Sequence, residues 1–202
     1  RDSQSAVPES RDGIARSLKL LERAARNYPR HRDCFACHHQ TFPLLVQVEG
    51  RRLGIESDEP TRLGVAKFTR DWFSRRERDL RAGQAIDGRA ITVAYGLWTL
   101  ELAEVDDPVV DAMADYLLKV QRADGAWEPE ALRPPAEESK AFVTALALRG
   151  LRWSADRDRP IIVPRQSFQK DAGQDPRRNS QPDPRQNSQP LGERDAALVR
   201  AA

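Results

Sequence analysis

The sequence predicts an all-α protein. Along residues 10–154, apolar side chains recur at intervals of three and four positions, which is the spacing of one face of an amphipathic helix. No segment shows the period-two alternation of β-branched residues that a half-buried strand would show. Six helical segments result, and antiparallel helix pairs are their simplest arrangement.

The first helix is expected from about Ser10 to Tyr28, after a loose, polar lead-in formed by residues 1–9. Pro29 ends it, because a proline pushes the preceding residue out of the α region. The apolar positions of this helix are separated by four, three, four and three residues, as expected for a single face. They are Ile14, Leu18, Leu21, Ala25 and Tyr28.

A stretch rich in cysteine and histidine, residues 31–40, separates this helix from the second and is expected to be a loop. Thr41 has the side chain of a good N-cap, and Pro43 would then lie in the first helical turn, where its missing N–H costs nothing. Gly54 is the expected end of the second helix, since glycine accepts the left-handed conformation at a helix C-terminus.

Four further helices are expected in residues 60–153. The Asp87-Gly88 turn separates two of them, and Asp106-Asp107-Pro108 begins the fifth helix of the chain. The helix between these two signals is apolar on nearly all sides, which indicates that it is enclosed. The four helices span about 60–80, 89–103, 106–120 and 137–153.

From residue 155 onward the sequence predicts a disordered tail. Residues 175–182 and 183–190 form a tandem octapeptide that differs at one position and contains no large apolar residue. Such a segment cannot bury enough surface to offset the entropy lost on ordering. The expected organisation is therefore the lead-in, one helical domain at 10–154 and the tail at 155–202.

Composition argues against two classes of partner. The 33 basic and 31 acidic residues give a net charge of +2 on a mixed surface, so no nucleic-acid binding is expected. No run of about 18 apolar residues is present, so no transmembrane segment is expected. The first residue is Arg1 rather than Met, which is compatible with a leader that has been removed.

The reactive side chains are concentrated in residues 31–40, which hold both cysteines and all three histidines of the chain. Cys34-Phe-Ala-Cys37-His38 has the Cys-x-x-Cys-His spacing of a covalent c-type haem site. The two thiols would form thioethers with the haem vinyl groups, and His38 would ligate the iron. Met113, the only methionine, is the candidate for the opposite axial position, although a single Met on a helix face more often packs in a core.

Three other interpretations of this stretch remain open. Zinc would use Cys34, Cys37, His31 and either His38 or His39, but structural zinc sites usually take ligand pairs from separated segments. In the second interpretation, the two cysteines form a disulfide or a redox pair, although the sequence lacks the βαβ pattern of a thioredoxin-like site. In the third, the thiols are small buried apolar groups and the histidines bond locally.

A second motif lies at the end of the fifth helix. Residues 121–127, Gln-Arg-Ala-Asp-Gly-Ala-Trp, resemble the QW motif, Gln-x-x-x-Gly-x-Trp, of squalene cyclases and related α/α-toroid proteins. In that family the glutamine ties neighbouring helix ends together and the tryptophan stacks beneath it, which implies a structural role for Gln121 and Trp127. Gly125 is expected to adopt a positive φ. Some squalene-cyclase-like proteins also carry a Cys-x-x-Cys-His loop after a first helix.

The resemblance implies about half of an α/α toroid, because the chain has about half the helices of a complete ring. It therefore implies a missing half, an open arc or self-association. Class II terpene cyclases protonate their substrate with an Asp-x-Asp-Asp motif, and the nearest sequence, Glu104-Val-Asp106-Asp107, departs at its first position. Carboxylates directly before Pro108 are explained by the start of a helix. No catalytic residue is assigned.

Three functions follow from these motifs. The first is an exported, periplasmic or otherwise extracytoplasmic protein with one c-type haem, acting in electron transfer or redox sensing with a partner protein. The second is a toroid segment for binding or scaffolding, in which the Cys/His loop is structural. A terpene cyclase fragment is the weakest of the three, because the acid motif is incomplete.

Overall fold

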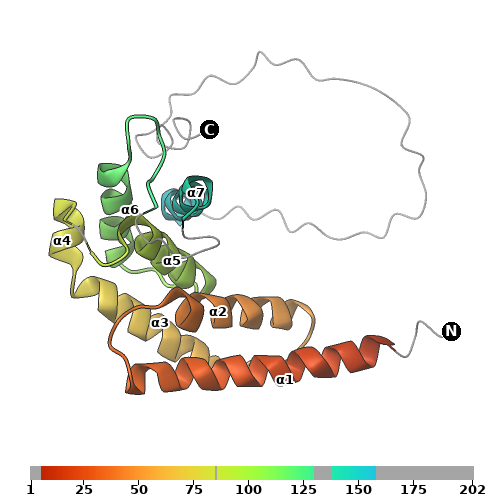
Figure 1. The fold of residues 1–202 in the computed structure, drawn as a ribbon. Coiled ribbons are helices and arrows are strands. Elements are labelled where there is room, and N and C mark those ends of the chain that lie inside the picture. Colours follow the sequence, from red (N-terminus) through yellow and green to blue (C-terminus); the bar gives the residue numbers. More distant parts are fainter. Residues whose placement is uncertain (1–5, 85, 130–137, 158–202) are drawn as a thin grey trace, which may run out of the picture.

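The computed structural model describes residues 6–84, 86–129 and 138–157, and throughout these residues the only regular structure is helical (Figure 1). The prediction of an all-α fold is confirmed. Of the tail expected at 155–202, residues 158–202, which include the octapeptide repeat, lie outside the described residues. The helices are α1 (Ala6–Asn27), α2 (Cys37–Arg52), α3 (Glu59–Ser74), α4 (Glu77–Ala82), α5 (Arg89–Leu102), α6 (Val109–Val120) and α7 (Lys140–Arg157), with a 3₁₀ turn at Tyr28–Arg30.

The longer helices form two layers. One is the α2–α5–α7 row, in which α5 packs against α2 on one side and α7 on the other. The second is the α1–α3–α6 row, in which α3 contacts both neighbours. Each helix of one row packs on at least one helix of the other, and the short α4 extends the α3 layer along α6 (Figure 1).

The first two helices are antiparallel. Arg11, near the start of α1, donates a hydrogen bond of 2.6 Å to the carbonyl of Gly54, just beyond the end of α2. At the opposite end, the ring of Tyr28 lies 4.5 Å from the ring of His39 in the first turn of α2. The predicted antiparallel pairing is confirmed for these two helices.

The neighbouring helices α5 and α7 of the α2–α5–α7 row run in the same direction. Tyr95 of α5 lies 6.2 Å, ring to ring, from Phe142 in the first turn of α7. Further along both helices, Arg149 forms an ion pair of 3.0 Å with Glu101. Parallel neighbours within one row require the connecting chain to return through the other row, and α6 supplies that return between α5 and α7.

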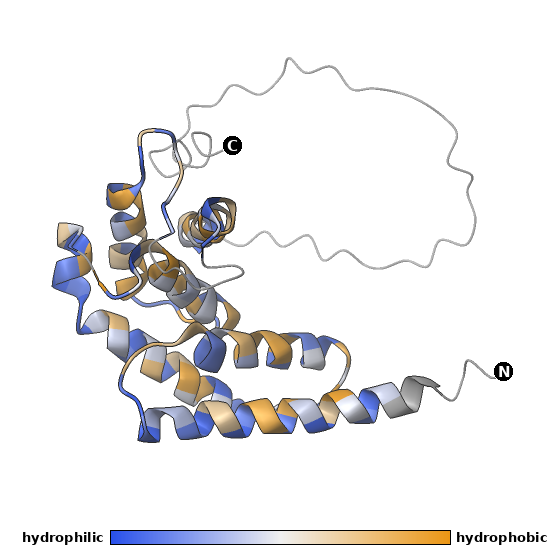
Figure 2. Ribbon diagram, viewed as in Figure 1, coloured by the Kyte–Doolittle hydropathy of each residue, from blue (hydrophilic) through white to orange (hydrophobic). Residues whose placement is uncertain are grey.

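The core lies between the two rows and is closest-packed around Gly96 of α5. A Cβ at this position would lie 2.7 Å from Met113 Cε and would overlap the Phe73 ring. The glycine therefore allows α3 and α6 to approach the backbone of α5. Figure 2 shows that apolar residues predominate on α6, whereas polar and apolar residues alternate along α1, whose outer side faces solvent.

The start of the second helix differs from the prediction. α2 begins at Cys37, and Thr41 is buried inside it instead of capping it. The hydroxyl of Thr41 lies 2.7 Å from the hydroxyl of Thr99 on α5, so it bonds across the helix interface. Pro43 is accommodated inside the helix rather than near a Thr41 cap.

The segment expected to be one helix at 60–80 is two, α3 and α4. Arg76 turns back over the end of α3, where its guanidinium stacks 3.7 Å from the Trp72 ring and donates a hydrogen bond of 2.9 Å to the Trp72 carbonyl. The Arg76 side chain thus satisfies one free carbonyl of the last turn of α3 and lies over the Trp72 ring, close to the end of the helix. The left-handed Gly83 then ends α4.

The outer limits of the helical domain also differ from those expected. α1 begins at Ala6, so residues 6–9 are not a loose lead-in, and α7 continues to Arg157, beyond the expected boundary at 154. The last turn of α7 is held because Arg157, 13% exposed in its side chain, forms ion pairs of 3.0 Å with Asp106 and 2.9 Å with Asp111.

The packing at Gly96 gives a testable difference between two glycines. Gly96→Ala should lower the free energy of unfolding by about 1–3 kcal/mol or more, because the added methyl group overpacks the Phe73 and Met113 contact. Gly64→Ala on α3 is the matched control, since nothing lies within 4 Å of its added Cβ. It should stabilise the helix by up to about 1 kcal/mol. Chemical denaturation of both variants measures the effects, and equal changes would contradict the proposed close packing.

Candidate functional site

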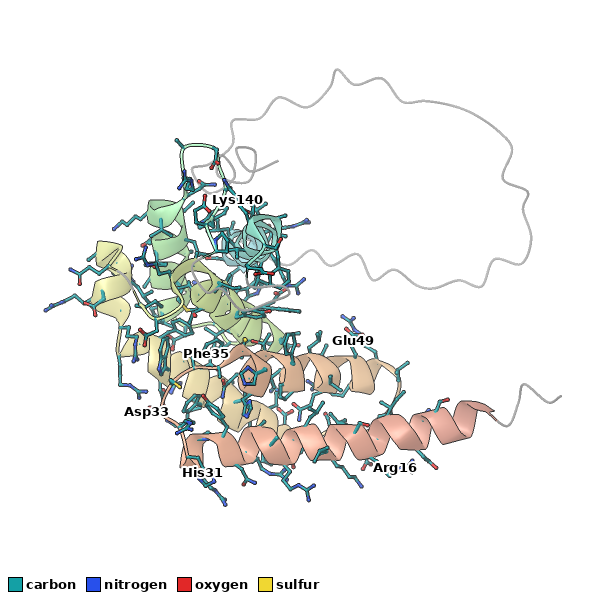
Figure 3. All side chains as sticks on the ribbon, in the orientation of Figure 1. Arg16, His31, Asp33, Phe35, Glu49 and Lys140 are labelled. Carbon is teal, nitrogen blue, oxygen red and sulfur yellow. The ribbon has the colours of Figure 1, made fainter. Side chains whose placement is uncertain are left out.

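The Cys/His stretch lies at the end of the α1–α2 pair, where the chain turns from one row to the other. Cys34 is exposed in the loop, and Cys37 is the first residue of α2. Between them the Phe35 ring is buried against Phe73 at 5.4 Å, so it anchors the loop to the core. Figure 3 shows Phe35 directed toward the helices, whereas Asp33 lies at the outer edge.

The second half of the predicted loop is helical. Cys37, His38 and His39 form the first turn of α2, which restricts their side chains to separate directions around the helix. The prediction of a loop over 31–40 is therefore wrong for residues 37–40. The error follows from assigning the cap to Thr41, whose local sequence fits a cap but whose hydroxyl bonds to α5.

Gln40 fixes the backbone between the two cysteines. Its side chain is 1% exposed, and its Oε1 accepts a hydrogen bond of 2.7 Å from the N–H of Ala36. Ala36 is the N-cap of α2 and has no capping side chain of its own, so Gln40 satisfies one of the free N–H groups there. This residue was missed in the sequence; a glutamine reaching back to the N-cap N–H, as in a capping box, is the signal that could have indicated it.

The two thiols are in different surroundings, and they are not joined in a disulfide. Cys34 Sγ forms a hydrogen bond of 3.2 Å with the hydroxyl of Tyr28. Burial raises the pKa of Tyr28 to about 12, and the contact with Cys34 adds to the shift. Cys37 is half-buried against the core, and its Sγ lies 3.9 Å from Nδ1 of His38.

The three histidines also differ. His31 is exposed beside the end of α1 (Figure 3), and His38 is exposed on α2. His39 is half-buried between the Tyr28 ring and the His38 ring, each at 4.5 Å. Burial lowers the pKa of His39, and the nearby His38 lowers it further. In the described part of the chain, no three His, Cys, Asp or Glu side chains gather into a group that could hold a metal ion.

The residues needed for covalent haem attachment are accessible. Cys34 and His38 are exposed and Cys37 is half-buried, so both sulfurs and an imidazole are available at the surface. A cavity beside this stretch, lined by residues that include Gln40 and Phe68, has a volume of about 140 Å³. That volume is below the roughly 300–1,000 Å³ of an enclosing ligand pocket. Two thiols and a neighbouring imidazole are the side chains that covalent attachment of a c-type haem would use.

Met113, the candidate for the opposite axial position, is fully buried on α6. It forms part of the core cluster and lies against Gly96 of α5. An iron bound to His38 at the surface would reach this sulfur only if the core opened. Met113 is thus part of the packed core, whereas His38, the other predicted axial ligand, is exposed at the surface.

The motif at 121–127 forms the turn that follows α6. Gly125 has φ = +82°, as expected, and the Gln121 side chain donates a hydrogen bond of 2.9 Å to the Gly125 carbonyl. Trp127 is fully buried, and its indole N–H donates a hydrogen bond of 2.8 Å to the carbonyl of Leu117. This glutamine hydrogen bond thus lies within its own turn, and the tryptophan satisfies a free carbonyl of the last turn of α6.

The acidic sequence before α6 makes structural contacts. Asp107 Oδ1 accepts a hydrogen bond of 3.0 Å from the N–H of Val109, which begins the helix. Asp106 is paired with Arg157 at 3.0 Å, and its side chain is largely exposed to solvent. Neither carboxylate is enclosed in an apolar cavity, which is the environment that protonation of a hydrocarbon would need.

No family model, no curated protein and no solved structure matches this chain. Within the part of the chain that the structure describes, no helix combines the length and apolar character needed to cross a membrane. The assignment of function therefore depends on the residues and contacts of the Cys/His site itself.

The Gln40 contact predicts how the loop between the cysteines is held. Gln40→Met keeps the side-chain volume but removes the acceptor, so the Ala36 N–H loses its partner at a cost of about 1–3 kcal/mol in the free energy of unfolding. The exchange of the Ala36 amide with deuterium, followed by NMR, should become faster. Gln84→Met, at an exposed glutamine, is the control. Unchanged Ala36 exchange in Gln40→Met would show that Gln40 does not fix this loop.

The position of His39 predicts a pH dependence of stability. Its folded pKa lies below the unfolded value of 6.5, so the unfolded chain takes up the proton more readily. The contribution of neutral His39 to the free energy of unfolding is therefore present above pH 6.5 and is lost as the pH falls below that value. Denaturation between pH 7.5 and 5 should therefore show a steeper loss for the wild type than for His39→Gln. His31→Gln is the matched control at an exposed histidine, and a His39→Gln slope equal to that of the wild type would contradict the prediction.

Proposed function

We propose that Cys34, Cys37 and His38 attach one c-type haem covalently and that the protein transfers electrons or senses redox state. The observation that carries the proposal is the Cys-x-x-Cys-His sequence at the surface, with no disulfide between its cysteines and an exposed His38 beside them. This spacing is the usual attachment sequence of c-type haem. The bound group would supply one-electron chemistry by cycling its iron between the ferrous and ferric states.

Attachment needs no oxidant. Cys34 and Cys37 would each hold the group through a thioether, formed by addition of S–H across one vinyl group, with the carbon–sulfur bond at one vinyl carbon and the proton on the other. The neutral imidazole of His38 donates a nitrogen lone pair. Gln40 holds the backbone that separates the two sulfurs, and Phe35 fixes the loop to the core.

The compartment and partner follow from this chemistry. Covalent haem is attached after export, so the proposal places the protein in the periplasm or another extracytoplasmic space. An exposed haem would exchange electrons with a redox partner protein. Zinc and a purely structural Cys/His site remain the alternatives for the cofactor.

We propose the second motif as a scaffold feature. The two rows of helices, with parallel neighbours in the α2–α5–α7 row, are what an open arc of an α/α toroid similar to squalene-cyclase-like proteins would have. The Trp127 bond to Leu117 supports a bracing role for the Gln121–Trp127 turn. The missing part of such a ring would come from self-association or from another chain. The contacts of Asp106 and Asp107 give no support to cyclase activity.

A dithiol redox function is the second candidate, and one observation favours it. Cys37 is the first residue of a helix, where the N-terminal dipole stabilises a thiolate. In this case the Cys34 and Cys37 thiols would reduce a disulfide of a partner protein. Two electrons and two protons would pass to the partner, and a Cys34–Cys37 disulfide would form.

Expression of the whole chain with a c-type haem maturation system separates these functions. The wild type should carry haem that resists acid-acetone extraction, while Cys34→Ser and Cys37→Ser should each remove one thioether and lower the haem content. His31→Gln, at an exposed histidine outside the motif, should keep full attachment. A colourless wild type would overturn the haem proposal. Mass spectrometry of that protein would then show whether Cys34 and Cys37 interconvert between thiols and a disulfide.

A further inference from the structure

We propose that Phe42, supported by the α5 aromatic side chains that it contacts, forms the surface on which the haem would lie. This inference rests on the haem attachment proposed above and names the residues that would cover the apolar face of the group. Phe42 presents a large aromatic side chain at the surface of α2, where it is 40% exposed.

The helical period places Phe42 next to the proposed iron ligand. His38, Phe42, Leu45 and Glu49 are separated by four, three and four residues, so they share one face of α2. His38, Phe42 and Glu49 are exposed and Leu45 is half-buried, which shows that this face is directed to solvent. Glu49 projects from the outer side of α2 in Figure 3.

The distance along the helix suits a flat group. Four residues correspond to a rise of about 6 Å, so Phe42 lies roughly one turn beyond His38. The cysteines lie on the other side of His38 along the chain, at the start of the helix. A macrocycle held by Cys34, Cys37 and His38 and directed along the helix would therefore cover the exposed side of the Phe42 ring. Burial of apolar area favours this direction over one that leaves the macrocycle in water.

Phe42 is supported by a wider aromatic group on α5. Its ring lies 6.0 Å from that of Tyr95 and 6.5 Å from that of Trp98, both nearly perpendicular to it. Tyr95 and Trp98 are themselves nearly parallel, 6.2 Å apart. Arg149 of α7 lies over the Trp98 ring at 5.1 Å. Since these contacts hold the Phe42 ring from below, its exposed side is already oriented without a ligand.

The consequence for the haem is a change in its reduction potential. Apolar cover disfavours the more highly charged ferric form, so removing the Phe42 ring should expose the haem to water and lower the potential. The asymmetric surroundings of the haem should also change. Covalent attachment itself should be unaffected, because the thioethers are made by Cys34 and Cys37.

The test compares holoproteins produced with the c-type maturation system. Phe42→Ala should carry as much covalent haem as the wild type but have a lower reduction potential and an altered Soret circular dichroism spectrum. Phe42→Leu keeps apolar bulk and should retain most of the wild-type potential. The control is Leu53→Ala, which removes an apolar side chain that is 57% exposed at the far end of α2. It should change neither measurement.

The outcomes separate this inference from the proposed function. A wild type without covalent haem would overturn both. A haem-bearing wild type whose potential and Soret dichroism equal those of Phe42→Ala would overturn the Phe42 surface alone and leave haem attachment standing. Far-ultraviolet circular dichroism of each variant checks folding. If Phe42→Ala is unfolded, Phe42→Leu and the polar variant Phe42→Gln are compared instead. A wild-type reduction potential in Phe42→Leu and a lowered one in Phe42→Gln would support the role of Phe42 as apolar cover, whereas equal potentials in both variants would overturn it.

Discussion

The close approach of three helices at Gly96 is the constraint on which the rest of the structure depends. α5 contacts α2, α3, α6 and α7, and only a residue without a side chain leaves room there for the Phe73 ring and Met113. The same Phe73 ring also receives Phe35 from the Cys/His loop at 5.4 Å. The position of the two thiols is therefore set by the packing of the core, and the candidate site is an extension of it.

The helices could be predicted from the sequence because their apolar faces repeat within a few residues. The same is true of turns that depend on one residue, such as Gly54 and Gly125, which both adopt positive φ. The start of α2 could not be predicted in this way. Thr41 satisfies the local pattern of a cap, but its hydroxyl bonds to Thr99, which is 58 residues away in the sequence. A local pattern contains no information about such a contact.

The site shows the same division. The types and spacing of Cys34, Cys37 and His38 are visible in the sequence, and they define the chemistry that is proposed. The surroundings of these residues are not visible in the sequence, because they depend on the hydrogen bond between Gln40 and the Ala36 N–H and on the one between Tyr28 and Cys34. A sequence pattern also cannot show that Met113 is enclosed by helices that follow the site in the chain.

The Arg157 contacts have a practical consequence for the limits of the folded unit. This side chain joins the last turn of α7 to Asp106 and Asp111 at the start of α6, and it also donates a hydrogen bond of 3.2 Å to the Asp107 carbonyl. A fragment cut at residue 154, where the change in composition suggests a boundary, would lose the Arg157 guanidinium that pairs with the Asp106 and Asp111 carboxylates. The helical unit that can be excised for crystallisation or labelling therefore extends at least through residue 157.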